Sequence, residues 1–409
     1  SAAGGECVYA VEIDSKAAAV YEHNWGYNPL GDITKDAGDE IVRVPEHDVL
    51  CAGFPCQPFS KSGAQRGMDE TRGTLYWNIL RIIQERRPSI VILENVRNLV
   101  GPRHKHEWQV IIETLRAEGY RVSDLPTVFS PHLLPPDMGG RPQVRERVFI
   151  TATRVSDLDA FELTCQPAVV KAPIRDWDPS SWNLISDLPL LTGAIDGCEL
   201  SESETLWIDA WDDFVQLMWE ERAGRRLPGF PIWADEWTTR EQLSTERLER
   251  EPKWKADFLL KNSEFYSEHQ ESLDEWAERW GVFTAAFPSS RRKLEWQAQD
   301  TPRLWDTVMH FRPSGIRAKA PTYLPALVAI TQTSIIGPLK RRLSSREAAR
   351  LQGLPEWFDF GDQPNSATYR QLGNGVSIGA IWYVLQKHVE RDADVLKITN
   401  PKLLKAIQE

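Results

Sequence analysis

The chain is poor in the features that mark secreted, membrane-spanning and metal-binding proteins. Only five of its 409 residues are cysteine, an odd and scattered set that does not form a disulfide framework. No run of 18 apolar residues is present, which argues against a membrane span. The first residues also do not show the charged and then apolar pattern of a secretory signal. His104 and His106 lack companions at the spacing of metal ligands. We therefore expect a cytoplasmic protein without a metal and without a membrane anchor.

A surplus of positive charge is also missing, since the formal net charge is -11. Nucleic-acid binding draws on Lys and Arg, so the total alone argues against it. However, residues 195–280 hold 22 acidic against 10 basic side chains, and the rest of the chain is close to neutral. Basic residues cluster in that remainder, at Arg66, Arg72, Arg141, Arg145, Arg147, Lys340, Arg341 and Arg342. The charge distribution therefore leaves nucleic-acid binding open.

Short apolar runs alternate with helical patterns over the first 155 residues. The expected strands are 7–13, 49–52, 90–94 and 147–152, and the expected helices are 15–24, 74–85 and 106–118. Such alternation is typical of βαβ units. It predicts an α/β fold with a doubly wound, mostly parallel, Rossmann-like sheet that has helices on both faces.

The character of the chain changes near residue 155. Twelve of the 17 tryptophans lie between Trp177 and Trp305, and acidic helices are expected at 203–221 and 239–267. The α/β pattern resumes near residue 318, with helices expected at 344–351 and 377–391. We predict a core over 1–164, a large inserted domain over 165–318, and the C-terminal part of the core over 319–409.

The most informative segment is Gly53-Phe54-Pro55-Cys56-Gln57-Pro58-Phe59-Ser60. It follows a predicted strand, so the chain turns at the strand's carboxyl end, where open sheets bind ligands. Cys56 is a candidate nucleophile at this turn. The alternative is that Cys56 is a small buried residue, the commoner fate of a single cysteine.

Four more blocks accompany the Pro-Cys-Gln turn, in a fixed order. They are Glu94-Asn95-Val96, Gln143-Val144-Arg145-Glu146-Arg147, the segment from Arg346 to Pro355, and the segment from Gln371 to Ser377. With these blocks the chain resembles the DNA (cytosine-5)-methyltransferases of bacterial type. The resemblance implies double-stranded DNA as substrate and S-adenosylmethionine as methyl donor, and it implies that residues 165–318 recognise the target.

Methylation at C5 of cytosine needs covalent activation, because this carbon is hardly nucleophilic in the intact ring. A thiolate that adds to C6 makes C5 enamine-like, and Cys56 fits this role. Glu94 is a candidate proton donor to N3 of the ring; alternatively it serves as a helix cap or salt-bridge partner. The resemblance implies that Asn95 holds the loop with Pro55, and that Arg145 and Arg147 contact the cytosine oxygen and orient Glu94.

The target base is inaccessible in a stacked duplex and must be flipped out. Residues 56–75 are rich in Ser, Gly, Gln and Arg and could close behind it. The resemblance implies that Ser60 and Arg72 touch phosphate and that Ser62 and Gln65 fill the vacated space. The alternative is a polar linker without a role.

The resemblance also implies a cofactor site. Glu12 ends a predicted strand, where a carboxylate takes ribose hydroxyls. The full set of implied cofactor-binding residues is Glu12, Ile13, Asp32, Ile33, Pro55, Leu75, Asn374 and Val376. In the family a Gly-rich loop precedes the strand that carries Glu12. Gly4 and Gly5 lie too close to that strand to replace the loop, so we expect the first strand and its loop to be missing from the site.

Two other functions share these blocks. One is methyl transfer to tRNA, and the other is DNA binding by an inactive homologue. The presence of Cys56, Glu94, Arg145 and Arg147 disfavours inactivity, and the tryptophan-rich insert favours DNA. We expect a monomer that works with a restriction or other defence system.

Overall fold

The computed structural model describes residues 4–55, 74–155, 161–174, 176–327 and 333–408. The chain forms two compact units. Unit 1 comprises Ser1–Ser180, Pro325–Ala329 and Ala349–Glu409, and unit 2 comprises Ser181–Leu324 and Ile330–Ala348. None of the helices described is both long and apolar enough to cross a membrane.

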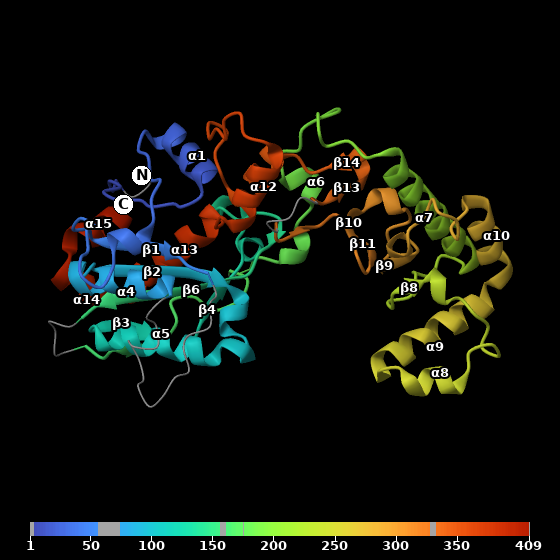
Figure 1. Ribbon diagram of the computed structural model, residues 1–409, viewed down its shortest axis with the longest axis horizontal. Helices are drawn as coiled ribbons and strands as arrows, with labels where there is room; N and C mark the ends of the chain where they lie inside the picture. The colour runs from blue at the N-terminus through green and yellow to red at the C-terminus, as the bar shows by residue number, and fades with distance from the viewer. Residues whose placement is uncertain (1–3, 56–73, 156–160, 175, 328–332, 409) are drawn as a thin grey trace. The chain divides into compact units, whose positions relative to one another are not determined.

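Unit 1 is built on a six-stranded sheet in the order β1-β2-β6-β3-β7, with β4 also paired to β6 (Figure 1). The β1–β2 and β3–β7 pairs are parallel, whereas β6 is antiparallel to β2, β3 and β4. Hence only β6 runs against the other strands, and the predicted mostly parallel sheet is confirmed. The strands are β1 (Val49–Gly53), β2 (Ile90–Val96), β3 (Tyr120–Ser123), β4 (Thr127–Phe129), β6 (Arg147–Arg154) and β7 (Thr164–Cys165).

Helices cover both faces of this sheet, as β2 illustrates. Val91 and Leu93 face a core shared with α4 and α5, whereas Ile90 and Ile92 face α13, α14 and α15. Each such side chain contributes roughly 1.5–3 kcal/mol on burial, so the apolar run of β2 fixes its central place. The helices of unit 1 are α1 (Ser15–Trp25), α2 (Ile33–Asp36), α4 (Leu75–Arg86), α5 (Lys105–Ala117), α12 (Asn365–Asn374), α13 (Ile378–Arg391), α14 (Ala393–Thr399) and α15 (Pro401–Gln408); α11 (Ser345–Gln352) joins the two units.

The strand expected at residues 7–13 is not formed. Glu12 makes only an isolated parallel bridge to Leu30. Its N–H donates to the Pro29 carbonyl at 2.8 Å, and its carbonyl accepts from the Gly31 N–H at 3.0 Å. A strand requires a ladder of such bonds, and the described residues supply only this rung.

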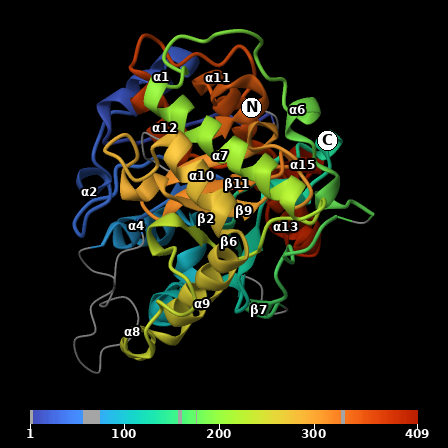
Figure 2. The same cartoon turned by 90° about the vertical axis from the view of Figure 1, so that its right-hand side faces the viewer.

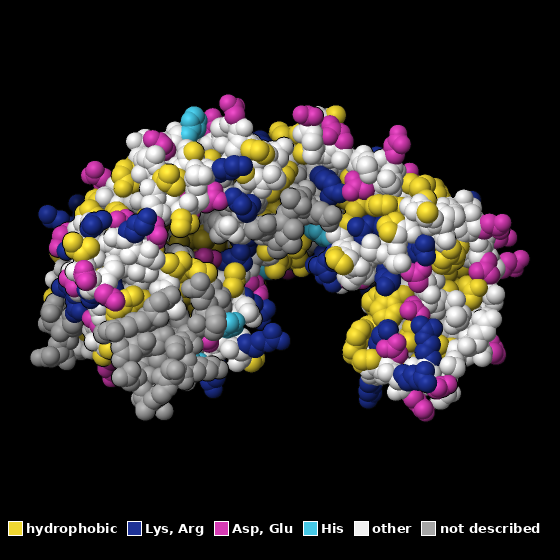
Figure 3. Space-filling view, viewed as in Figure 1, with side chains coloured by type: hydrophobic (Ala, Val, Ile, Leu, Met, Phe, Trp, Pro, Cys, Tyr) yellow, Lys and Arg dark blue, Asp and Glu magenta, His cyan; other side chains and the backbone are white. Residues whose placement is uncertain are grey.

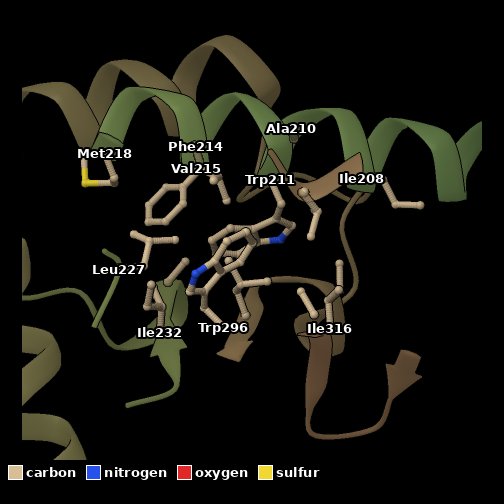
Figure 4. Close-up of a cluster of buried hydrophobic side chains, with 14 of the residues drawn as sticks. Ile208, Ala210, Trp211, Phe214, Val215, Met218, Leu227, Ile232, Trp296 and Ile316 are labelled. Carbon is tan, nitrogen blue, oxygen red and sulfur yellow. The ribbon is translucent and has the colours of Figure 1, made fainter. Parts of the chain in front are cut away.

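Unit 2 combines helices with a six-stranded sheet in the order β14-β13-β10-β11-β9-β8. Trp211 and Phe214 of the long helix α7 pack against the sheet residues Trp296 and Ile316 (Figure 4). Figure 2 shows α7, α9 and α10 on the side of unit 2 that faces the viewer. The elements are α6 (Leu184–Asp187), α7 (Glu202–Glu221), β8 (Ile232–Trp233), α8 (Thr245–Arg250), α9 (Lys253–Glu268), α10 (Gln270–Trp280), β9 (Lys293–Gln297), β10 (Val308–Arg312), β11 (Gly315–Lys319), β13 (Ile335–Ile336) and β14 (Arg341–Arg342).

The helix expected over 239–267 is divided into α8 and α9. Pro252 immediately precedes α9 and serves as its N-cap. Proline has no N–H to donate within a helix, and its ring disfavours a helical conformation of the residue before it. The acidic pattern runs through both helices, so only the proline marks the break.

Candidate active site

The ends of β1 and β2 lie side by side, and Gly53 pairs with Glu94 across this edge. A Cβ atom at position 53 would lie 3.6 Å from Glu94 Oε2, so glycine leaves the carboxyl group uncovered. Pro55 lies two residues after the end of β1. Cys56 lies outside the described residues, as do Ser60, Ser62, Gln65 and Arg72.

Glu94 forms an ion pair with Arg147, the first residue of β6. Arg147 Nε lies 3.0 Å from Glu94 Oε1, and both side chains are only 14% exposed. Burial raises the pKa of Glu94, although Arg147 and Arg145 act in the opposite direction. A carboxyl group in this environment holds its proton at a higher pH than an exposed one, which suits a proton donor.

Asn95 connects the end of β2 to the turn after β1. Its Nδ2 donates to the Phe54 carbonyl at 2.8 Å, and its Oδ1 accepts from the Val96 N–H at 2.8 Å. The side chain is almost fully buried. Asn95 therefore fixes the backbone one residue before Pro55, while its predicted support of the loop that follows stays a prediction.

Arg145 lies deeper than Arg147 and is only 1% exposed. Its guanidinium group donates to the carbonyls of Leu327 at 2.9 Å and of Gly373 at 2.6 Å, and also to that of Gly375. Burial, followed by the positive charge of Arg147, lowers the pKa of Arg145 to about 9. These contacts tie the third sequence block to the fifth, while the predicted contact of Arg145 with the cytosine oxygen stays a prediction.

Unit 1 also contains a cavity of about 360 Å³. Two of the predicted cofactor residues, Glu12 and Val376, line it. Its aromatic wall was not predicted from the sequence, although two spacings could have indicated it. Tyr21 and Trp25 are four residues apart on α1, and two phenylalanines follow the fourth block. The remaining lining residues include Phe358, Phe360, Gln352, Leu354, Gln371, Leu372 and Gly375.

The other predicted cofactor residues do not line this cavity. Ile13 is 75% exposed, and Ile33 packs in apolar clusters. Asp32 caps α2 by accepting from the Thr34 N–H and hydroxyl group, and these bonds lower its pKa. Pro55 follows β1, Leu75 begins α4, and Asn374 ends α12. Their roles in cofactor binding stay predictions.

No three His, Cys, Asp or Glu side chains gather in a metal-binding arrangement within the described parts of the chain.

Comparison with known proteins gives the family. A family model described as C-5 cytosine-specific DNA methylase matches residues 1–390. The Type II methyltransferase M.AluI of Cellulosimicrobium cellulans is 53% identical over 472 residues, which cover 98% of this chain and 90% of that protein. The Type II methyltransferase M.BanI of Aneurinibacillus aneurinilyticus is 29% identical and covers 96% and 91%, respectively. A solved structure of a putative DNA modification methyltransferase from an E. coli prophage aligns with 20% identity and a TM-score of 0.48, over 96% of this chain and 94% of that one.

The family assignment decides between the functions left open by the sequence. It confirms the predicted DNA cytosine-C5 methyltransferase and does not favour transfer to tRNA or an inactive homologue. The chain belongs to the C-5 cytosine-specific DNA methylases.

Proposed function

We propose that Cys56 is the nucleophile of this DNA methyltransferase and that Glu94 is the proton donor to the target cytosine. The pairing of Gly53 with Glu94 carries the proposal. This pairing places the Glu94 carboxyl group beside the end of β1. Gly53, the last residue of β1, precedes Cys56 by three positions. The bond from Asn95 to the Phe54 carbonyl supports the same arrangement.

In the proposed mechanism, the Cys56 thiolate adds to C6 while the Glu94 carboxyl group protonates N3. The raised pKa of Glu94 keeps the proton available. Arg147 holds the carboxyl group in place and balances its charge after the proton has left. Once C5 carries the methyl group, departure of the C5 proton to a water re-forms the C5–C6 double bond and expels the thiolate, and N3 returns its proton to Glu94.

The cavity lined by Glu12 and Val376 fits the S-adenosylmethionine that this family uses. Glu12 Oε1 accepts from the Asp14 N–H at 2.7 Å, which orients the carboxylate for ribose hydroxyls. The aromatic wall of Tyr21, Trp25 and Phe358 suits an adenine ring. Bound S-adenosylmethionine supplies an electrophilic methyl group to C5.

We further propose a Type II role, in which the enzyme methylates one short DNA sequence beside a cognate restriction or defence system. The similarity to M.AluI across 98% of the chain supports it. Residues 165–318 are proposed to choose the sequence. We propose a monomer in the cytoplasm.

Tritiated S-adenosylmethionine, incubated with the purified protein and either unmethylated duplex DNA or tRNA, tests the function. Label should enter DNA and not tRNA. Cys56→Ser should abolish transfer. The matched control is Cys51→Ser, which removes a thiol from β1 only five residues away. This variant should retain methyl transfer. Label in tRNA alone, or an active Cys56→Ser protein, would refute the proposal.

A further inference from the structure

Unit 2 separates its charges between two parts of its sequence. Residues 181–290, which form its helices and β8, carry 23 acidic against 10 basic side chains. Residues 291–342, which contain β9, β10 and β11, carry 10 basic against only 3 acidic side chains. An acidic helical surface repels DNA, whereas a basic sheet attracts it.

Four of these ten basic residues, Lys293, Arg312, Arg317 and Lys319, lie on one face of the sheet. Phe311, Ile316 and Trp296 point to the opposite face and enter the core with α7. Because side chains alternate along a strand, the residues between them point away from that core. Figure 3 shows dark-blue side chains beside a histidine in the part of unit 2 where Figure 1 draws β10 and β11. The polar and charged residues of this outer sheet face are Lys293, Glu295, Gln297, His310, Arg312, Arg317 and Lys319.

The positive charges on the outer sheet face are poorly balanced. Within the described residues, the side chains of Arg312 and Lys319 have no ion-pair partner. Burial and their mutual repulsion with Arg317 lower the pKa of both groups. Burial also lowers the pKa of His310 to about 4, with the three cations adding to the effect. A bound anion would relieve this repulsion.

Arg317 differs from the other cations because it is oriented by a carboxylate. Its Nε donates to Glu295 Oε2 at 2.6 Å across the β9–β11 pair. The described residues give its two terminal nitrogens no hydrogen-bond partner. An arginine fixed in this way presents a planar pair of donors, and the major-groove edge of guanine, with O6 and N7, is the base edge that such a pair fits.

We propose that the outer sheet face is the surface with which unit 2 binds the DNA substrate. Arg312 and Lys319 contact phosphates, and Arg317, positioned by Glu295, reads a guanine in the target. The inference rests on the proposed function and names the residues by which that function selects its sequence. It places DNA recognition on the sheet of unit 2 and excludes the acidic helices of this unit as the DNA-binding surface.

The test uses the full-length protein and a duplex carrying its target, which bisulfite sequencing of an enzyme-treated unmethylated plasmid identifies. Arg312→Gln and Lys319→Gln should each reduce the slope of log K against log salt by about 0.9, for target and scrambled duplexes alike. The matched control, Lys261→Gln on α9, removes an exposed cation from the same unit and should leave the slope unchanged. An unchanged slope in the Arg312→Gln/Lys319→Gln double variant, with unaltered thermal unfolding, would overturn the proposal.

Arg317→Lys keeps the charge but removes the planar donor pair. The binding preference is the affinity for the target duplex relative to a duplex in which one guanine–cytosine pair is replaced. Arg317→Lys should lower this preference about 10- to 100-fold. Glu295→Gln should lower the same preference with little change in the binding of scrambled DNA. If Arg317→Lys keeps full preference at every guanine, the assignment of Arg317 is wrong. Failure of the unsubstituted protein to methylate any duplex would instead refute the proposed function.

Discussion

Glu94→Gln removes the proposed proton donor while it retains the size and polarity of the side chain. The variant can still donate from its amide, but it cannot protonate N3 and it loses the charge that pairs with Arg147. Loss of one transition-state donor typically costs 10²–10³-fold in kcat, so we expect a fall in turnover on the order of 10²-fold. This corresponds to about 2.7 kcal/mol of transition-state stabilisation. Affinity for S-adenosylmethionine should change little.

The pH dependence provides a second readout of the same group. Because burial raises the pKa of Glu94, ionisation of this residue is less favourable in the folded protein than in the unfolded chain. The free energy of unfolding should therefore fall as the pH rises through the folded pKa, and Glu94→Gln should abolish that fall. Wild-type kcat should decline over the same range, since the protonated form is the donor. At a series of pH values, turnover assays measure kcat and urea unfolding measures the free energy of unfolding.

Glu146→Gln is the matched control for this substitution. Glu146 lies next to Arg147 and pairs with Arg97 at 2.6 Å and with Lys171. The control alters a carboxylate beside the site that has no proposed part in the reaction, and its turnover should stay within about threefold of wild type. If Glu94→Gln also stays within threefold, Glu94 is a structural residue and the proton has another source.

Three further predictions follow from other parts of the chain. Asn95→Ala leaves the Phe54 carbonyl without its partner, so urea unfolding should show a loss of about 1–3 kcal/mol, together with reduced turnover. Burial lowers the pKa of His388 to about 3, so stability should fall as the pH drops below about 6.5, where the unfolded chain takes up a proton; His388→Gln should weaken this dependence in urea unfolding. Exchange of residues 165–318 with those of a relative that has another target should redirect methylation, as bisulfite sequencing can show, whereas retention of the original target would place recognition outside residues 165–318.

The sequence predicted those features of unit 1 that depend on local patterns. The apolar run of β2 and the amphipathic spacing of α4 and α5 indicated a sheet with helices on both faces, and these elements are present. The five motif blocks gave the family directly. The strand at residues 7–13 was predicted wrongly, because its apolar pattern contains no information about which backbone groups can pair with it.

Contacts between distant segments could not be predicted in the same way. The sequence does not show that Arg145 binds the Gly373 and Gly375 carbonyls, since these residues are more than 200 positions apart. The outer sheet face could not be predicted from the sequence for a related reason. Its cations lie on three strands and are brought together only by the register of β9, β10 and β11.

The most direct test of the account is covalent capture of Cys56. In duplex DNA with 5-fluorocytosine at the target position, fluorine cannot leave C5 as the proton does, so the enzyme–DNA adduct should persist after methyl transfer. With S-adenosylmethionine present, a denaturing gel should show a shifted band, and mass mapping should place the attached nucleotide on Cys56. No adduct from a protein that methylates normal DNA, or attachment to Cys7, Cys51, Cys165 or Cys198, would contradict the proposed mechanism.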